Sequence, residues 1–342
     1  MTGWVETLEL FADEIEIVAL YDPDPGQATR RAPSYHDPSL RPELGPAYAQ
    51  LPFETDLEAL IAEHRLDLAL VTLPNRDASA AIERLAKAGI HQVVDKPASI
   101  GPKGARRAFG AAAAAGVRIV VGLTRRYSPA ARAAREVVAA GRLGRIVAAD
   151  AVFATSSVAI RGPGNPLFSR ELSGGGILTW LGIHDVDTLL WVVGEPVVEV
   201  AAMVGAVGDP SIGVEDVSSV SLRFAGGAIA TLHHAYALPA RGYRPSLAVR
   251  GTDASVELGQ GEDLVLVVAG EDGFIREERT SFDVEELPGY GASGHAAVAD
   301  LLAAIHEARD PAASARELVA ALEVIDAAYE AARTKRHVTL GA

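Results

Sequence analysis

The sequence predicts an α/β protein of two domains, a first domain at residues 1–122 and a second at residues 123–342. The chain of 342 residues exceeds the ~250–300 residues at which a single hydrophobic core stops growing. Short β-branched runs alternate with helical stretches up to about residue 122, which is typical of parallel βαβ units. Closely spaced runs of period two follow, and these favour a mostly antiparallel sheet in the second domain.

The first domain contains four predicted parallel strands with helices between them. We expect the strands at residues 15–21, 68–73, 91–94 and 118–122. Apolar residues at helical spacing predict amphipathic helices at 55–64 and 78–88. The proline-rich residues 23–52 are predicted to be mainly a loop.

The second domain begins with a predicted helix at residues 128–140, which ends at Gly141. A strand at 145–153 and a long apolar helix at 175–193 follow. Period-two runs then predict strands at residues 197–207, 217–224, 228–236, 246–250 and 264–268. Gly226-Gly227 is a predicted hairpin turn, and helices at 295–308 and 314–333 end the chain.

Composition excludes several classes of function. The 45 acidic and 31 basic residues give a net charge of −14, which repels nucleic acids and anionic membranes. The chain has no cysteine, so disulfides, thiolate metal sites and cysteine nucleophiles are excluded. Acidic residues near the N-terminus do not fit a secretory signal, and no uncharged apolar run reaches the ~20 residues that cross a bilayer. We expect a cytoplasmic protein without nucleic-acid or membrane partners.

Asp22 follows the first predicted strand. An acidic residue at the carboxyl end of the second strand of a dinucleotide-binding unit accepts hydrogen bonds from the ribose hydroxyls and repels a 2′-phosphate, which favours NAD over NADP. On the local sequence alone, a turn started by Asp22-Pro23 is the stronger interpretation.

The glycine-rich fingerprint of such a unit is incomplete. Gly3 stands the expected ~20 residues before Asp22 and matches the last glycine of GxGxxG, while the first strand and the earlier glycines are missing. Either the natural protein begins upstream or cofactor binding is impaired. We expect the first, because the missing strand would be central in a parallel sheet.

The segment GGGILTWLGIHDVD at residues 174–187 is the most informative of the chain. Three glycines open an apolar helix that carries His184, as a site requires where substrate approaches the backbone closely and gives up a proton. A lone histidine on an apolar helix face is more often a satisfied core residue. Lys96, in Asp95-Lys96-Pro97 at the end of a buried strand, would by itself be a solvated lysine.

Taken together, the motifs resemble the glucose-fructose oxidoreductase and inositol dehydrogenase family (Gfo/Idh/MocA) over nearly the whole chain. The landmarks occur in a specific order: LYDPDP at 20–25, TLPNRDAS at 72–79, HQVVDKPAS at 91–99, VGLTRRYSP at 121–129, GRLGRI at 141–146, GIHDVD at 182–187 and ALEVIDAAYEAA at 321–332. The resemblance implies an N-terminal Rossmann domain whose first strand is missing. It also implies a C-terminal domain with a large open sheet, whose exposed face commonly forms dimers or tetramers.

The resemblance implies catalytic roles for two residues. Lys96 matches the lysine of the family's EKP motif, which lies near the nicotinamide and the reacting hydroxyl and precedes a proline that is often cis. His184 matches the proton-transfer histidine, since imidazole titrates near neutrality. Lys96 would stabilise the developing alkoxide. Asp95 and Pro97 would lie against the cofactor.

One position departs from the family. An aspartate that orients the histidine often stands four residues before it, where this chain has Trp180. We expect Trp180 to mark a subgroup with a more apolar substrate pocket; loss of catalysis is the alternative. We expect Asp187, three residues after His184, to lie alongside it on the helix and to contact substrate, although it also matches a structural aspartate of the family.

Further matches imply contacts with cofactor and substrate. Pro74 and Asn75 match a loop that contacts the cofactor, although Ala78 replaces a histidine usual just after it. Arg126 would contact an anionic or hydroxylated substrate, or else cap the following helix. Tyr236 would line the pocket, although a buried aromatic is the ordinary explanation.

We expect no metal site. His233 and His234 are adjacent on a strand and point to opposite faces, so they do not chelate one ion. His184 and Asp187 lie one helical turn apart, and no third ligand is evident.

The sequence therefore predicts an NAD-dependent dehydrogenase acting on a CH–OH group of a sugar, cyclitol or related polyol. One alternative keeps the fold and cofactor but uses transient oxidation for elimination or glycosidic cleavage. Another is a catalytically silent nucleotide-binding protein. Net accumulation of NADH distinguishes a dehydrogenase from the first alternative, which returns its hydride. Titration with NADH tests the second alternative, because it shows whether the cofactor binds.

Overall fold

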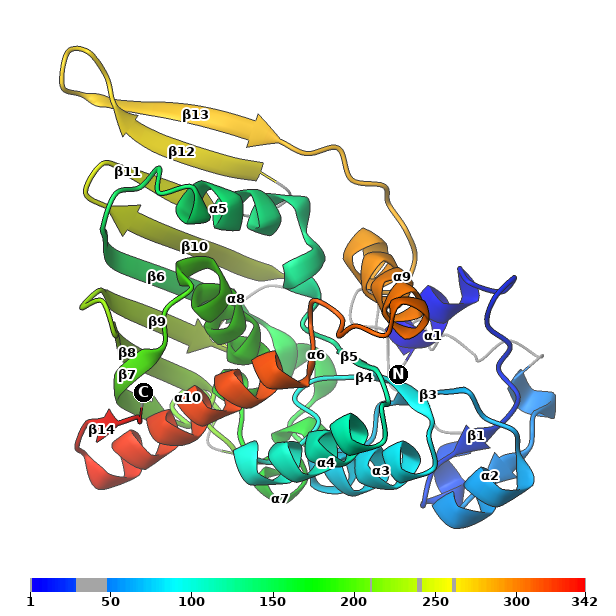
Figure 1. Ribbon diagram of the computed structural model, residues 1–342. Helices are drawn as coiled ribbons and strands as arrows, with labels where there is room; N and C mark the ends of the chain where they lie inside the picture. Colours follow the sequence, from blue (N-terminus) through cyan, green and yellow to red (C-terminus); the bar gives the residue numbers. More distant parts are fainter. Residues whose placement is uncertain (1, 29–47, 210, 239–241, 260–262, 342) are drawn as a thin grey trace.

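The computed structural model describes residues 2–28, 48–209, 211–238, 242–259 and 263–341 (Figure 1). Short parallel strands with covering helices form the N-terminal part, and a nine-stranded sheet dominates the C-terminal part. This arrangement confirms the predicted α/β class and the change from parallel to mostly antiparallel strands.

In its described residues, the N-terminal part contains five short strands and four α-helices. The strands are β1 (Leu20–Tyr21), β2 (Phe53–Glu54), β3 (Leu68–Val71), β4 (His91–Val94) and β5 (Ile119–Val121). The helices are α1 (Thr2–Glu9), α2 (Leu57–Glu63), α3 (Asn75–Lys87) and α4 (Pro102–Ala114). Asp56 caps α2 by accepting a hydrogen bond from Glu58 N, and Pro102 occupies the first turn of α4.

The parallel strands form two separate sheets, β1–β2 and β3–β4–β5, with no ladder between them in the described part of the chain. The strand predicted at residues 15–21 is therefore too long, because only Leu20 and Tyr21 are in β1. A strand needs ladder partners along its length, and the only partner of β1 among the described residues is the two-residue β2.

The C-terminal part holds the remaining elements. Its strands are β6 (Ile146–Thr155), β7 (Val197–Gly205), β8 (Val217–Phe224), β9 (Ile229–Ala235), β10 (Tyr243–Gly251), β11 (Ala254–Leu258), β12 (Asp263–Ala269), β13 (Ile275–Ser281) and β14 (Val338–Thr339). Its helices are α5 (Pro129–Ala139), α6 (Ser157–Arg161), α7 (Arg170–Ser173), α8 (Ile183–Val193), α9 (Gly291–Glu307) and α10 (Ala315–Thr334). A π-helical turn, Leu178–Gly182, directly precedes α8.

The nine strands are ordered β13-β12-β11-β10-β6-β9-β8-β7-β14. Neighbouring strands are antiparallel except β6 and β9, which run parallel. Strand β13 was not predicted, because its sequence IREERTS is exposed throughout and so lacks an apolar alternation. His233 is exposed and His234 is buried, which confirms that they face opposite sides of β9.

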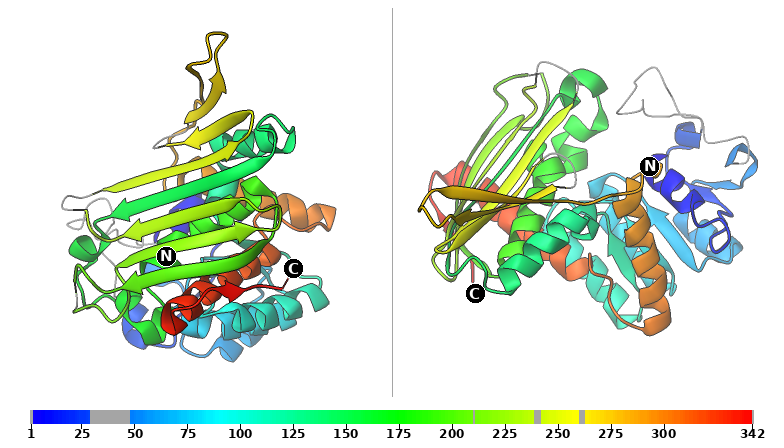
Figure 2. Two further views of the ribbon diagram at one scale, coloured as in Figure 1. Left: turned by 90° about the vertical axis from the view of Figure 1, so that its left-hand side faces the viewer. Right: turned by 90° about the horizontal axis from the view of Figure 1, so that it is seen from above.

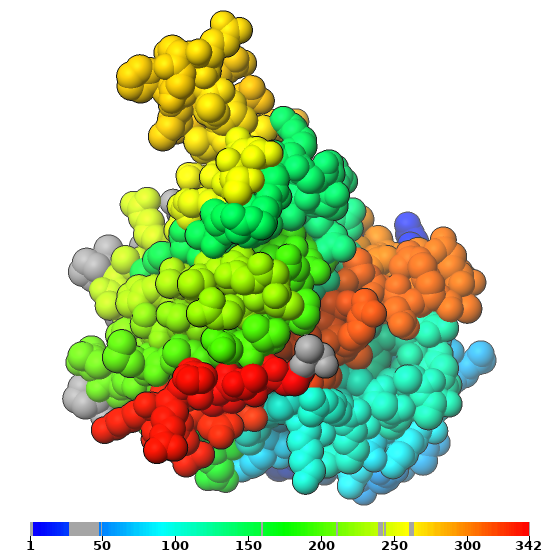
Figure 3. Space-filling view, turned by 60° about the vertical axis from the view of Figure 1, so that its left-hand side comes forward, coloured from blue at the N-terminus to red at the C-terminus, as the bar shows by residue number. Residues whose placement is uncertain are grey.

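Helices cover only one face of this sheet. Helices α5, α8 and α10 pack against it, and the other face is open (Figure 2). Met203, Ile229 and Val152 are among the exposed apolar residues of these strands. The β12–β13 hairpin projects beyond the rest of the molecule (Figure 3).

Helix α9 belongs to the second half of the chain but packs against α1 and β5 of the first. The Phe11 ring stacks on His295 of α9 with centroids 4.7 Å apart. The two predicted domains are thus joined by a helix that crosses from one to the other. Helix α9 packs against α1, the helix that carries the buried Trp4.

The segment Arg170–Val193 is long and apolar enough to span a membrane, but 72% of its most apolar window is buried inside the protein. Burial of that kind is typical of a core helix. The segment contains the π-helical turn and α8, so the central helix of the fold also carries His184.

Candidate active site

Lys96 lies at the carboxyl end of β4, between the ends of β3 and β5. Parallel strands bind ligands at this edge. The Lys96 side chain is buried, and its backbone N–H donates to the Asp95 carboxylate at 2.9 Å. The Lys96–Pro97 peptide bond is cis, as the resemblance implied.

The helix that carries His184 is anchored at its start by a buried carboxylate. Glu215 accepts hydrogen bonds from Gly176 N at 2.9 Å and from Leu178 N at 3.2 Å. The Tyr329 hydroxyl donates to the same carboxylate at 2.7 Å. A carboxylate at this position satisfies free backbone N–H groups and complements the helix dipole.

This anchor explains the glycine triplet. A Cβ atom on Gly176 would overlap the backbone oxygen of Glu215, and one on Gly175 would overlap the Tyr329 hydroxyl. Gly174 has a φ of +82°, which L side chains rarely adopt. The sequence analysis expected substrate to approach this backbone closely. In the structure, Glu215 and Tyr329 occupy that space.

Lys96 is tied to the same helix at the π-helical turn. Its Nζ donates a hydrogen bond to the carbonyl oxygen of Trp180 and lies 5.1 Å from the centroid of the Trp180 ring. A π-helical turn interrupts the regular α-helical pattern and frequently marks a functional site. The lysine from the N-terminal part thus contacts the helix one turn before His184.

The protonation of Lys96 and His184 is strongly perturbed. Burial lowers the pKa of Lys96 to about 8, with the Arg125 charge acting in the same direction. Burial and the positive charges of Lys96 and Arg125 lower the pKa of His184 well below its usual value. Imidazole Nδ1 of His184 is buried and has no hydrogen-bond partner among the residues that the structure describes. The aspartate that commonly satisfies such a nitrogen is replaced here by Trp180.

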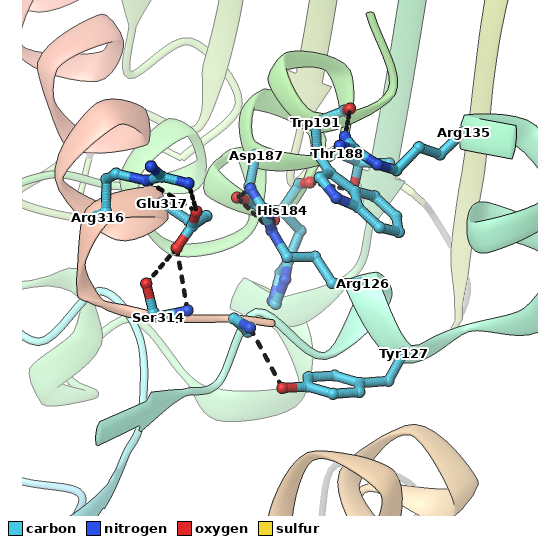
Figure 4. A network of polar contacts seen from close by, with 11 residues as sticks. Arg126, Tyr127, Arg135, His184, Asp187, Thr188, Trp191, Ser314, Arg316 and Glu317 are labelled. Atoms are coloured by element: carbon cyan, nitrogen blue, oxygen red, sulfur yellow. Dashed lines mark hydrogen bonds and ion pairs between the residues drawn. The ribbon is translucent and has the colours of Figure 1, made fainter. Parts of the chain in front are cut away.

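Arg126 and Asp187 pair with each other behind His184 (Figure 4). Arg126 Nη2 lies 2.7 Å from Asp187 Oδ1 and Nε lies 3.0 Å from Oδ2, and the guanidinium also stacks 5.3 Å from the Trp191 ring centroid. Both residues are buried. The sequence analysis placed both in substrate contacts, with helix capping as the alternative for Arg126 and a structural role as the alternative for Asp187. In the structure their polar groups are directed at one another.

Arg125, the neighbour of Arg126, faces the site instead. Its Nη1 donates to the buried carboxylate of Asp185, whose other oxygen lies 3.0 Å from His234 Nε2. His234 Nδ1 lies 3.1 Å from Ser218 Oγ. The sequence analysis missed Arg125 and Asp185. The sequence contained a signal for these residues: HDVD has two aspartates and TRRY has two arginines, which indicates two ion pairs.

Trp180 forms one wall of the site. It packs against a small apolar cluster that includes Tyr236 and Phe168, whose rings lie 5.6 Å apart edge to face. The Arg161 guanidinium lies 4.8 Å from the Trp180 ring centroid. The position that commonly holds an aspartate is thus part of an aromatic wall, with Tyr236 behind it.

On the N-terminal side, Gly3 packs against Tyr290. A Cβ atom on Gly3 would lie 3.1 Å from the Tyr290 ring, and this ring lies 4.6 Å from the Trp4 ring. The charge of Asp95 raises the pKa of Tyr290, which indicates that the Asp95 carboxylate lies near the phenol. Tyr290 is a further residue at this edge that the sequence analysis did not identify.

The remaining predicted cofactor residues follow the strands β1 and β3. Pro74 precedes α3, and Asn75 Nδ2 donates to the Ser173 carbonyl at 2.7 Å, which joins α3 to α7. The Asp22 carboxylate accepts from Asp24 N at 2.9 Å, and burial raises its pKa. Asp77, in the first turn of α3, contributes to that shift.

These residues fit the ribose and nicotinamide ends of a dinucleotide. The Lys96 ammonium is buried and donates one hydrogen bond within the described residues, to Trp180, so a substrate oxygen would satisfy its remaining N–H groups. In the described ranges, no group of three or more acidic, histidine or cysteine side chains is placed to hold a metal ion.

Comparison with known proteins shows the family of this chain. Residues 4–123 match the oxidoreductase family model with an NAD-binding Rossmann fold, and residues 131–257 match the GFO/IDH/MocA C-terminal domain. Fold and site define an NAD(P)-dependent oxidoreductase acting on CH–OH groups. The chain belongs to the Gfo/Idh/MocA family.

Relatives of known activity act on cyclitols and sugars. The chain is 26% identical over 287 residues to inositol 2-dehydrogenase of Rhizobium meliloti (strain 1021), covering 83% of this chain and 84% of the relative. It is 31% identical over 202 residues to 1,5-anhydro-D-fructose reductase of Ensifer adhaerens, covering 59% of this chain and 60% of that reductase. The fold matches levoglucosan dehydrogenase in complex with NADH with a TM-score of 0.83 at 17% identity, covering 99% of this chain and 95% of that one.

Proposed function

We propose that the protein oxidises a secondary alcohol of a sugar, cyclitol or related polyol with NAD, and that Lys96 and His184 act at the reacting carbon. The observation that carries this proposal is the hydrogen bond from Lys96 to Trp180, since it joins the lysine of one half to the helix of His184 in the other. Inositol 2-dehydrogenase and 1,5-anhydro-D-fructose reductase among the relatives support a polyhydroxylated substrate.

The chain's own groups handle the proton of the alcohol. Bound nicotinamide supplies the hydride acceptor. Lys96, as an ammonium, donates a hydrogen bond to the substrate oxygen and stabilises the negative charge that develops there. His184 is neutral above its lowered pKa and accepts the hydroxyl proton at Nε2, the ring nitrogen other than the buried Nδ1. Trp180 excludes water from one side of the carbon.

We propose NAD rather than NADP as the cofactor. The half-buried Asp22 carboxylate, with Asp77 nearby, would repel a 2′-phosphate and accept hydrogen bonds from ribose hydroxyls. The expected result is a higher kcat/KM with NAD, and a smaller preference in Asp22→Ser. Equal use of NAD and NADP by the unmodified protein would contradict this assignment.

The proposed function is tested with a panel of sugars and inositols by the absorbance of NADH. His184→Ala should reduce kcat by on the order of 10²–10⁴ while the affinity for NADH, measured by fluorescence titration, changes little. Unchanged turnover in His184→Ala would remove the assigned base. Substrate consumption without net NADH would instead indicate elimination or cleavage through transient oxidation.

We propose that the open face of the nine-stranded sheet packs against a second copy of the chain in a dimer or tetramer, and that the protein is cytoplasmic. Met203, which is 77% exposed, joins Ile229 and Val152 among the exposed apolar side chains of this sheet, and an exposed apolar patch marks a protein–protein interaction site. Sedimentation of the protein and of Met203→Glu tests the assembly; a monomer in both cases would contradict it.

A further inference from the structure

The two adjacent arginines of the 3₁₀ turn Thr124–Tyr127 have different surroundings. Arg126 is buried and directs both ends of its guanidinium at Asp187. Arg125 is 28% exposed and makes one hydrogen bond to the described residues, from Nη1 to Asp185. Its Nε and Nη2 edge is therefore available to a ligand.

Arg125 is held in place by groups from three elements of the C-terminal part. Asp185, on α8, is 1% exposed, and its second oxygen contacts His234 of β9 at 3.0 Å. His234 is completely buried and is itself fixed by Ser218 of β8 at 3.1 Å. The His234 ring also packs under Gly182, where a Cβ atom would lie 2.9 Å from it. An arginine that only covered the surface would not require a buried chain of partners, because such side chains are ordinarily solvated and mobile.

The guanidinium lies beside the groups proposed to act at the reacting carbon. Asp185 directly follows His184 in the chain, so its bond to Arg125 brings the guanidinium to this part of the helix. The charge of Arg125 lowers the pKa of both Lys96 and His184. The two charges that shift the pKa of His184 are both positive. The surroundings of His184 are thus electropositive in a protein whose net charge is −14, whereas the negative charge of Asp95 acts on Lys96.

We infer that the substrate is a polyhydroxylated carboxylic acid, such as a uronic or aldonic acid, and that Arg125 binds its carboxylate through the free edge of the guanidinium. This inference rests on the proposed function, whose substrate class it narrows. A guanidinium binds a carboxylate through two parallel N–H···O bonds, which fixes the orientation as well as the charge of the ligand. The carboxylate then determines which hydroxyl lies between Lys96 and His184. Arg125 is thus the residue that determines specificity.

The test compares matched neutral and acidic substrates with NAD: D-glucose with D-glucuronate, and D-galactose with D-galacturonate. Glucose 6-phosphate is the phosphorylated arm. We expect kcat/KM for the acid to exceed that for the neutral sugar by at least ~10-fold, and this acid-to-neutral ratio to fall ~30-fold in Arg125→Gln. The ratio is the readout because the lost charge also acts on Lys96 and His184, which would serve both sugars. Arg125→Lys keeps the charge without the fork and should recover part of the loss. Arg142→Gln, at an exposed arginine, is the matched control and should change neither substrate.

A preference for the neutral or phosphorylated sugar, or an equal loss for acid and neutral sugar in Arg125→Gln, would overturn the inference and leave the proposed function intact. Binding of D-glucuronate, followed by calorimetry in the unmodified protein and in Arg125→Gln, is read without turnover. Binding of D-glucuronate to the unmodified protein but not to Arg125→Gln supports the inference, even if no NADH forms. Absence of NADH would refute the dehydrogenase assignment and leave the inference about the carboxylate intact. Binding that is the same in both proteins overturns the inference.

Discussion

Replacing Arg126 with methionine leaves the carboxylate of Asp187 buried without its partner. The two side chains are 6% and 2% exposed and share three contacts of 2.7 to 3.1 Å. Removing one member of a buried ion pair costs about 3–5 kcal/mol, because the remaining charge is neither solvated nor compensated. We expect Arg126→Met to lower the free energy of unfolding by that amount at pH 8, measured by urea denaturation.

The loss should depend on pH in a defined direction. Burial raises the pKa of Asp187 from 3.8 to about 6 in the folded protein. The fold therefore favours the protonated carboxyl, and this contribution is present below about pH 4 and disappears as pH rises through about 6. Without the Arg126 charge, which lowers this pKa, the carboxyl takes up a proton more readily. The destabilisation of Arg126→Met should therefore be smaller at pH 5 than at pH 8, by at least ~1.4 kcal/mol, the value of one pKa unit.

The double variant Arg126→Met/Asp187→Leu is the control, since it removes both charges and keeps apolar volume. It should recover most of the lost stability, because apolar replacement of a whole buried pair is often neutral or stabilising. A cost below ~1 kcal/mol for Arg126→Met, accompanied by a large rise in KM, would refute the structural role. Such a result would return Arg126 to the substrate contact that the sequence suggested.

Three further results are expected from the site. Lys96→Met should lower kcat by on the order of 10²–10³ with little change in NADH affinity, measured by fluorescence titration, because it removes a donor to the developing alkoxide; equal loss of cofactor binding would contradict this. Because Lys96 acts as an ammonium of pKa about 8 and His184 is already neutral, kcat/KM should fall as pH rises through about 8. This fall should be absent in Lys96→Met. A rise of kcat/KM through pH 8 would instead make the lysine the base. Gly176→Ala should lower the thermal midpoint, because its Cβ overlaps the Glu215 backbone, whereas Gly110→Ala, on α4 with open space around it, should raise it slightly; equal effects would contradict the anchor.

The chemistry at the centre of the site could be predicted from short motifs. DKP and GIHDVD identify Lys96 and His184 because each follows a recognisable strand or glycine-rich helix start, and family resemblance then supplies their roles. The hydrogen bond from Lys96 to Trp180 was not foreseen, since it depends on a π-helical turn. The sequence LTWLG has no pattern that separates this turn from an ordinary α-helix.

The direction of side chains within a short turn could not be predicted from the sequence. Arg125 and Arg126 are chemically identical neighbours, and only the path of the 3₁₀ turn decides which meets Asp185 and which meets Asp187. Strand pairing is similarly non-local. The apolar run at residues 15–21 resembles a full strand, yet β1 is short because its ladder depends on residues more than thirty positions away.

The eight residues from Trp180 to Asp187 make separate connections to Lys96, Arg125 and Arg126 from one helical rod. Successive residues of a helix are rotated by about 100° about its axis, so a single insertion or deletion here would rotate all groups on one side of it out of register with those on the other side. Point substitutions in this stretch remove one contact and leave the others aligned. Insertions and deletions between residues 180 and 187 should therefore be far more damaging than substitutions. Redesign of the pocket should substitute side chains in this segment and change the length only of the loops around the site.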